Sequence, residues 1–227
     1  EGWAALSKKD YGSLLTGRVR TADTTIDTRL GSPGASDIER ARTLAGVTRI
    51  LTGRERDRRD LSLVMPAVGI ESREALFGAV SASLDSLLEH AIDVGVILGG
   101  DMDARVRPAI VDGITGSGIR MKAFDSMASA VNGGSDMIVT TNLVVTPRVS
   151  ETTISSQTVK LFWSDWVLSL TAIDPSSKAV VDTIVLTDKA SGRDPDQAVQ
   201  RMIGRISETQ TPAMARWIYD VIIRPEK

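Results

Sequence analysis

The apolar residues of the middle third of the chain repeat with the spacing of an α-helix. In residues 72–92 they lie one, three or four positions apart, with Glu, Ser and Asp between them. This pattern predicts a helix with one apolar face. The same spacing predicts further helices over residues 103–114 and 119–131. The apolar positions of this region that we single out are Leu76, Phe77, Val80, Leu84, Leu87, Leu88, Ile92, Val106, Ile110, Ile114, Phe124, Met127 and Val131.

The N-terminal 60 residues predict short strands followed by a helix. β-Branched residues recur in residues 14–20 and 24–30, which favours one or two strands. Ser36 or Asp37 then offers an N-cap for a helix that Gly53 ends. Residues 54–60, Arg-Glu-Arg-Asp-Arg-Arg-Asp, are interpreted as a solvated turn.

The last third alternates between apolar and polar residues, as β-strands do. The alternation predicts strands over residues 136–146, 159–173 and 179–187. Pro147 is expected to end the first strand, and a change of phase at Ser164 and Asp165 predicts a β-bulge in the second.

Two sequence signals near the C-terminus predict the starts of helices. Asp194-Pro195 places an N-cap residue before a proline at the first helical position, and Thr211-Pro212 repeats this pattern. The apolar positions after each signal have helical spacing, so we expect two final helices.

These elements predict an α+β fold, in which an α/β/α layered body has an antiparallel sheet and glycine-hinged amphipathic helices. We expect a single domain over residues 1–227. Its parts are entry strands and a helix in 1–60, an amphipathic helical region in 61–135, and the sheet with the C-terminal helices in 136–227. The glycines of the helical region are expected to act as hinges, which are Gly95, Gly99, Gly100, Gly113, Gly116, Gly118, Gly133 and Gly134.

Charge and cysteine content exclude several classes of function. The chain has 27 Lys and Arg against 29 Asp and Glu, so its net charge of -2 offers no general attraction for a polyanion. We therefore expect no nucleic-acid partner. The absence of cysteine excludes thiol catalysis, disulfides and zinc–thiolate sites. The longest apolar stretch, residues 94–100, is far shorter than a membrane-spanning helix.

The candidate chemical groups do not assemble into an enzyme. His90 and Asp93 are close enough along a helix to touch, but a nucleophile and an oxyanion hole are missing from the pattern. Asp101 and Asp103 begin a spacing typical of a calcium loop that breaks off at Arg105. Residues 113–118 are glycine-rich but lack the lysine of a phosphate-binding loop. We expect no catalytic residues, no cofactor and no metal.

Two interpretations of the amphipathic helices remain open. They form either permanent core in a soluble scaffold or protein-interaction domain, or surfaces that insert into lipid or line a cavity for a lipid-like ligand. Their polar faces carry many serines and few charges, which favours insertion. The aromatic run in residues 162–166 is similarly open. One Trp fills the core and the other sits at the bulge, or one lies exposed at a ligand mouth or membrane interface.

The C-terminal pattern resembles that of small periplasmic envelope lipoproteins of bacteria. The residues that carry it are the hairpin in 172–181 and the helix that starts at Asp194. The whole chain, with 20 Arg against 7 Lys, is similar to the family of the treponemal concealed outer-membrane lipoprotein. The resemblance implies a lipid anchor on a cysteine before Glu1 and a location on the periplasmic side of the outer membrane. It also implies a closed form, an open form with an apolar cavity, and membrane phospholipid or a lipid-like ligand as the partner.

Overall fold

The computed structural model describes residues 7–101, 105–154 and 157–224. The chain divides into two compact units, one formed by residues 1–87 with 223–227 and the other by residues 88–222. The division after residue 87 falls inside the region 61–135 that the sequence pattern grouped together. We call them the helical unit and the sheet unit and describe each by itself.

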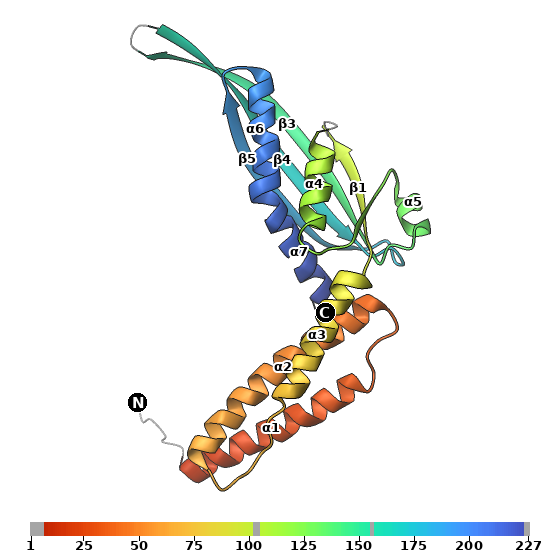
Figure 1. The fold of residues 1–227 in the computed structure, drawn as a ribbon, viewed down its shortest axis with the longest axis vertical. Helices are drawn as coiled ribbons and strands as arrows, with labels where there is room; N and C mark the ends of the chain where they lie inside the picture. Colours follow the sequence, from red (N-terminus) through yellow and green to blue (C-terminus); the bar gives the residue numbers. More distant parts are fainter. Residues whose placement is uncertain (1–6, 102–104, 155–156, 225–227) are drawn as a thin grey trace. The chain divides into compact units, whose positions relative to one another are not determined.

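The helical unit is built from α1 (Lys8–Leu30), α2 (Asp37–Val64) and most of α3 (Glu74–His90) (Figure 1). Side chains of these helices share one core. Its buried residues are Ile26, Val47, Leu51 and Val80, and Leu30, Leu44, Ile50, Leu76 and Phe77 pack against them. The helix expected in residues 72–92 is confirmed. The first part of its apolar face, Leu76, Phe77 and Val80, belongs to this core.

Helix α1 lies where strands were expected, so that prediction was wrong. Leu15, Val19 and Ile26 are buried at helical spacing. The threonines between them lose little in a helix, because their hydroxyls donate to carbonyl oxygens four residues earlier. Thr25 Oγ1, for example, lies 2.8 Å from the carbonyl oxygen of Thr21.

Helix α2 begins after Ser36, one of the two predicted N-cap residues, but continues much further than predicted. Ser36 accepts the backbone N–H of Glu39, and the Glu39 side chain accepts the N–H of Ser36, which completes a capping box. The predicted end at Gly53 and the predicted turn over residues 54–60 were wrong. Gly53 does not end the helix, because a single glycine costs only about 1 kcal/mol in a helix. Arg54, Glu55 and Asp57 are almost fully buried, so the charged run forms contacts that hold the helix together.

The sheet unit contains one five-stranded sheet in the order β2-β1-β3-β4-β5. The strands are β1 (Val94–Gly100), β2 (Met121–Phe124), β3 (Met137–Ile154), β4 (Gln157–Ile173) and β5 (Val180–Gly192). β1 pairs in parallel with β2 and β3, whereas β3, β4 and β5 form an antiparallel meander. The α+β class is confirmed, with a mixed sheet that is mostly antiparallel.

Three of the expected hinge glycines lie inside β1, so the hinge prediction was wrong for them. A Cβ at Gly95 would lie 2.5 Å from Ser135 Oγ, and a Cβ at Gly100 would lie 2.2 Å from the carbonyl oxygen of Leu143. Gly100 also has a φ of +82°. These positions need glycine because other segments of the protein approach the backbone closely there. They do not need it for backbone movement.

The helix expected over residues 119–131 was also wrong. Its first part is β2, and only α5 (Met127–Asn132) is helical, starting from a capping box between Ser126 and Ser129. The helix expected over 103–114 is confirmed as α4 (Val106–Thr115), in so far as it lies within the described residues. Asp103 lies outside them.

Strands β3 and β4 are longer and more regular than predicted. β3 continues through Pro147 because its pairing with β1 stops at Leu143, so no neighbouring strand needs the missing N–H. The expected bulge at Ser164 and Asp165 was wrong, since the register is continuous there and shifts only at Ala172 and Ile173. The apparent phase change arises because both faces of β4 carry large side chains.

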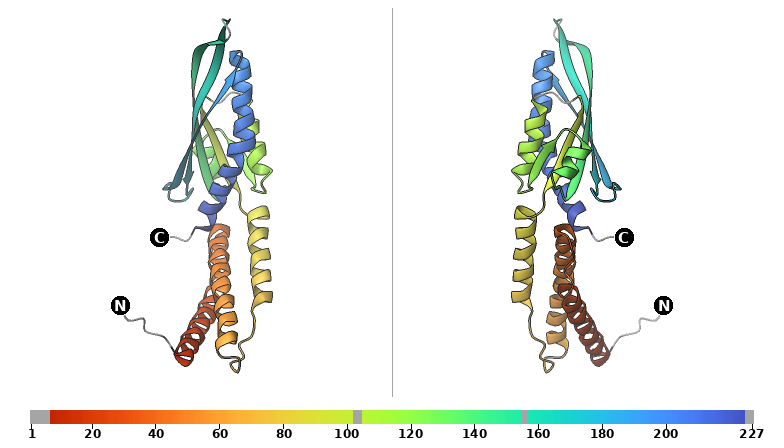
Figure 2. Two further views of the ribbon diagram at one scale, coloured as in Figure 1. Left: turned by 90° about the vertical axis from the view of Figure 1, so that its left-hand side faces the viewer. Right: turned by 90° about the vertical axis from the view of Figure 1, so that its right-hand side faces the viewer.

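Helices α4 and α6 (Pro195–Arg205) lie on one side of the sheet (Figure 2). Asp194 caps α6 as predicted, accepting the N–H of Gln197. The chain then passes through a π-helical turn, η1 (Ile206–Gln210), directly into α7 (Thr211–Ile223). The predicted N-cap at Thr211 was wrong. Its hydroxyl donates to the carbonyl oxygen of Ile206, and the wide turn accommodates Pro212 without ending the helix.

Candidate functional site

The structure buries much of the apolar surface that the sequence offered for lipid contact. The fully buried members of that set are Val80, Leu84, Ile92, Val106, Ile110 and Ile114. Those of intermediate exposure are Leu76, Phe77, Leu87, Leu88, Phe124 and Met127. Val131 is 38% exposed. The structure therefore packs the apolar face of α4, and the centre of the apolar face of α3, against protein.

The exposed apolar surface lies instead on the sheet. One face of β3, β4 and β5 points away from α4 and α6, and we call it the open face. Its residues are neighbours across the paired strands. Its residues are Asn142, Val144, Thr146, Arg148, Trp163, Asp165, Val167, Ser169, Val185, Thr187 and Lys189. Val144, Val167 and Val185 are 46%, 40% and 56% exposed. Because valine on a sheet face normally packs on another layer, the open face is the candidate binding surface.

Two positively charged side chains lie beside the ring of Trp163 at one end of the open face. The Trp163 ring centroid lies 5.2 Å from the Arg148 guanidinium carbon and 5.7 Å from Lys189 Nζ. Both distances are typical of cation–π contacts. The indole N–H of Trp163 donates to Ser150 Oγ at 2.8 Å, and Arg148 Nε lies 3.2 Å from a carboxylate oxygen of Asp165. We call these five residues the Trp163 cluster.

A hollow of about 410 Å³ lies beside this cluster. Thr146, Val167 and Thr187 line it together with Asp165 and Lys189. Asp188 also lines it, so the hollow combines one cation and two carboxylates with hydroxyl groups and apolar surface. Trp166 also borders it, but that side chain is 2% exposed and belongs to the core. Of the two tryptophans in the aromatic run, one is core and the other is at the surface.

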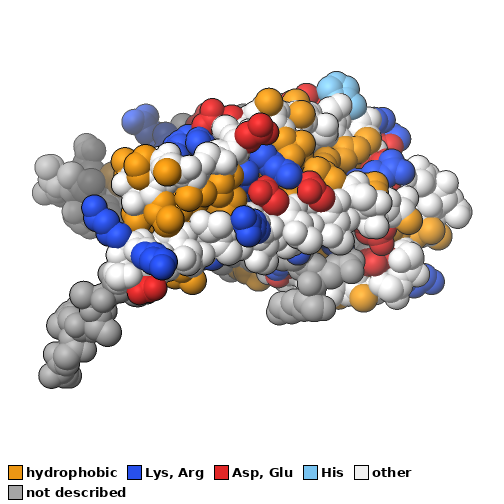
Figure 3. Space-filling view, turned by 90° about the horizontal axis from the view of Figure 1, so that it is seen from below, with side chains coloured by type: hydrophobic (Ala, Val, Ile, Leu, Met, Phe, Trp, Pro, Cys, Tyr) orange, Lys and Arg blue, Asp and Glu red, His pale blue; other side chains and the backbone are white. Residues whose placement is uncertain are grey.

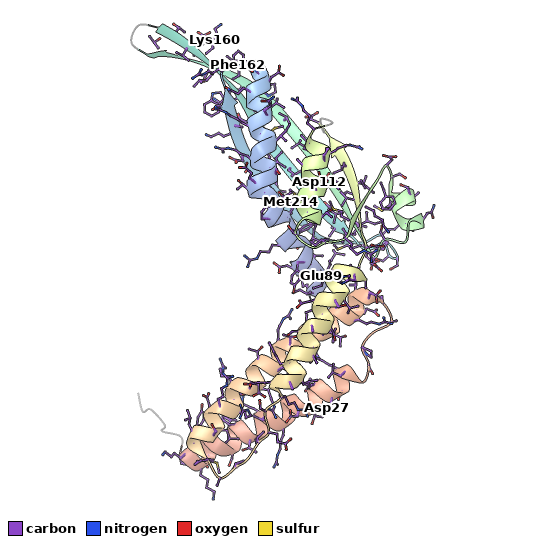
Figure 4. The ribbon with its side chains drawn as sticks, in the orientation of Figure 1. Asp27, Glu89, Asp112, Lys160, Phe162 and Met214 are labelled. Carbon is purple, nitrogen blue, oxygen red and sulfur yellow. The ribbon has the colours of Figure 1, made fainter. Side chains whose placement is uncertain are left out.

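Beyond the cluster, β3 and β4 continue as a two-stranded hairpin arm. We define the arm as residues 149–154 and 157–162, of which only Phe162 also pairs with β5. Lys160 and Phe162 mark it in Figure 4. Val149 and Val159 are 55% and 37% exposed, and Lys160 forms an exposed ion pair with Glu151 at 3.1 Å. A hairpin without a third strand or a packed face has little stability of its own.

The helical unit contains an ionic cluster that the sequence pattern did not reveal. It consists of Arg18, Arg54, Arg58 and Arg73 with Asp23, Asp27, Glu55 and Asp57. Arg54 bridges the carboxylates of Asp23 and Glu55. The positive and negative charges of the ionic cluster balance. Its side chains connect α1 and α2 to the segment before α3. We interpret it as structural.

Glu55 is the centre of this ionic cluster. It accepts the backbone N–H of Arg73 at 2.9 Å, the Arg58 Nε–H at 2.7 Å and a further hydrogen bond from Arg54. Burial acts to raise the pKa of Glu55, but these donors outweigh it and lower the pKa to about 2. A larger hollow of about 690 Å³ lies between α1 and α2, where Arg18, Arg54 and Asp57 are already paired.

The described catalytic and metal candidates of the sequence have other partners in the structure. The His90 side chain is 74% exposed and lies 3.9 Å from Glu89 (pale blue in Figure 3). Asp93 pairs instead with Arg120 and Lys122, at 3.1 and 2.9 Å. Asp101 accepts the backbone N–H of Val145. Among the described residues, no group of three or more His, Asp or Glu side chains could hold a metal ion.

The sequence predicted only part of the Trp163 cluster. The aromatic run drew attention to Trp163, but Arg148 and Lys189 are 15 and 26 positions away along the chain. Only the strand register brings them together. In the part of the chain that the structure describes, none of the helices has the length and apolar character needed to cross a membrane.

Comparisons with known proteins give weak structural similarities. Neither a protein-family model nor a curated protein sequence matches the chain. A putative neuraminyllactose-binding hemagglutinin homologue from Helicobacter pylori is similar over 56% of this chain and 83% of its own, with 12% identity and a TM-score of 0.41. A minor lipoprotein from Acinetobacter baumannii is similar over 56% and 91%, with 12% identity and a TM-score of 0.35.

A third similar structure is lipoprotein B from Nitrosomonas europaea, over 57% of this chain and 83% of its own, with 13% identity and a TM-score of 0.36. The similar structures thus include bacterial lipoproteins. None of these three is a treponemal protein, so the treponemal resemblance gains no support from them. Their TM-scores are too low to assign a family or a function.

Proposed function

We propose that the chain is a non-enzymatic binding protein of the bacterial envelope, which keeps its amphipathic helices packed and associates through its exposed sheet surface. The distribution of apolar surface is the observation that supports this proposal. The apolar face of α4 is buried and that of α3 is buried at Val80 and Leu84 and half-buried elsewhere, whereas valines of the open face are exposed. A soluble domain that exposes such a surface commonly binds a partner there.

The envelope location rests on the pattern resemblance to periplasmic lipoproteins of bacteria. We propose a position on the periplasmic side of the outer membrane, with a lipid anchor on a cysteine that precedes Glu1. Metabolic labelling of the natural full-length protein with palmitate, followed by separation of the two membranes, tests this. Label in the outer-membrane fraction supports the location, and unlabelled protein in the cytosol contradicts it.

Insertion of α3 and α4 into the membrane is the alternative to a permanently packed state. It would require residues such as Val80, Leu84 and Ile110 to leave the core. Each fully buried apolar side chain contributes roughly 1.5–3 kcal/mol. A membrane can shift that equilibrium only by binding the open form more tightly than the closed form. The glycines of β1 provide no hinge for such an opening. The packed state is therefore our preferred description.

Hydrogen exchange with and without liposomes tests the packed state. We expect the protection of Glu74–His90 and Val106–Thr115 to be the same in both conditions. Leu84→Asp should lower the free energy of unfolding by about 2–5 kcal/mol, because the site is 6% exposed. Leu63→Asp is the matched control, since Leu63 is 82% exposed. Loss of protection with liposomes, together with a stable Leu84→Asp variant, would favour insertion.

The absence of enzyme activity is part of the same proposal. His90→Ala should change any measured binding or turnover by less than about threefold, whereas loss of a general base costs ~10²–10⁴. A larger effect in a variant with a native melting temperature would contradict a non-enzymatic role.

A further inference from the structure

We infer that the Trp163 cluster and the hairpin arm together form a contact site for the surface of an anionic phospholipid membrane. This site is separate from α3 and α4, which remain packed. The inference rests on the charge of the cluster, on the environment of Trp163 and on the apolar groups of the arm. It goes beyond the proposed function by naming a partner and the residues that contact it.

The cluster has an uncompensated positive charge. The Asp165 carboxylate is paired with Arg148, and Asp188 is paired with Arg205 at 3.0 Å. Among the described residues, no carboxylate lies within ion-pair distance of Lys189. Lys189 is exposed at the rim of the 410 Å³ hollow. An anionic headgroup beside Lys189 would therefore add a pairing that the protein itself does not supply.

Trp163 has the environment of an interfacial tryptophan. Its ring is half-buried, its indole N–H already has a partner in Ser150, and two cations lie beside it. Tryptophan is enriched at the level of lipid headgroups, where its apolar ring and polar edge are both accommodated. Cations next to the ring place positive charge at the same level.

The arm supplies apolar groups beyond this level. Val159 and Leu161 lie on the same face as Trp163, whereas Val149 and Phe162 lie on the opposite face. Val149 and Val159 are exposed, and Leu161 and Phe162 are half-exposed. Because the arm has exposed apolar groups on both faces, a flat protein surface could cover only one of them. A lipid surface can surround both.

The charge of the arm is compatible with a position at a membrane surface. Lys160 and Glu151 neutralise each other, and both side chains are more than half exposed. These charged groups can remain at headgroup depth while the valines reach the apolar boundary. The arm would therefore lie at the interface. It need not cross the bilayer.

The test uses the full chain with vesicles of phosphatidylcholine, with or without roughly 30% phosphatidylglycerol. We expect flotation with the anionic vesicles, weakening as salt increases, and little with the neutral vesicles. Lys189→Glu should lower the affinity at least about tenfold, because it reverses a charge near the surface. Lys178→Glu, at the opposite end of β4 and β5, is the matched control and should stay within about twofold.

A second readout locates the contact. Quenching of tryptophan fluorescence by brominated lipids should occur in the natural chain and fall in Trp163→Phe, which keeps an aromatic ring at this site. The inference is overturned if the Lys189 and Lys178 variants bind equally, or if the chain binds neither vesicle. Binding of poly-L-glutamate without vesicle binding overturns it in favour of an acidic protein partner. None of these outcomes affects the separate test of the packed state, which measures the hydrogen-exchange protection of α3 and α4.

Discussion

The carboxylate of Asp101 accepts a hydrogen bond from the backbone N–H of Val145, with 3.0 Å between Asp101 Oδ2 and Val145 N. β1 ends at Gly100, so this side chain occupies the place of a further residue of β1 along β3. Two residues later, Pro147 has no N–H to offer. An added strand would find few donors on this edge, as in other proteins that protect their sheet edges.

Asp101→Ala should make this edge available to other molecules. The variant leaves the N–H of Val145 unpaired, which we expect to lower stability by about 1 kcal/mol and to increase self-association. Light scattering across a concentration series measures the association. Asp112→Ala, an exposed residue of α4, should leave both quantities unchanged. Identical behaviour of the two variants would show that Asp101 does not protect the edge.

Glu55→Gln should destabilise the helical unit much more than an equivalent change at the surface. The substitution leaves the buried Arg54 guanidinium without one of its carboxylates, and breaking a buried pair costs about 3–5 kcal/mol. Glu74→Gln is the matched control, because the exposed Arg59–Glu74 pair is worth less than about 1 kcal/mol. Chemical unfolding of both variants measures the difference. Equal losses would mean that the ionic cluster contributes nothing beyond surface pairing.

Acid should remove the contribution of Glu55 in a defined range. The pKa of Glu55 is lowered from 4.5 to about 2 in the folded protein, so its stabilising effect is fully present above 4.5. It is lost as the pH falls from about 4.5 toward 2 and amounts to at most about 3 kcal/mol. Unfolding measured over this range should show a smaller decrease in Glu55→Gln. Parallel curves would assign acid sensitivity to other carboxylates.

Gly100→Ala should be strongly destabilising, because the new Cβ would meet the carbonyl oxygen of Leu143 and φ is +82°. We expect a loss of more than about 2 kcal/mol in the free energy of unfolding. Gly78→Ala is the control, since nothing lies within 4 Å of the added Cβ on α3, and it should stabilise by about 0.5–1 kcal/mol. A neutral Gly100→Ala would restore the hinge interpretation.

The elements that could be predicted from sequence are those with strong local signals. Ser36 and Asp194 accept the hydrogen bonds expected of N-caps, and the turn before β5 is held by Asp174, whose side chain accepts from Ser176. The apolar stripe of α3 identified that helix because its spacing is uninterrupted. In each case, the residues that form the contact are neighbours in the sequence.

Several wrong predictions occurred where the partners are distant in the chain. Arg54 looked like part of a solvated turn because its partner Asp23 belongs to another helix. Gly95 looked like a hinge because Ser135, which needs the space, follows 40 positions later. For the candidate site, the sequence identified Trp163 as a candidate but could not place Lys189 beside it. The strand predicted over residues 179–187 ended before Lys189, whereas β5 continues to Gly192.

The order of the strands also determines how the sheet unit can fold. β3, β4 and β5 follow one another along the chain, so their pairing needs only short turns. By contrast, α4, β2 and α5 lie between β1 and β3 along the chain, so the pairing of β1 with β3 must close a long loop. Pairing between distant segments is slower, because closing a long loop must precede any gain from contacts. In refolding experiments followed by pulsed hydrogen exchange, we therefore expect the meander to become protected before β1 and β2.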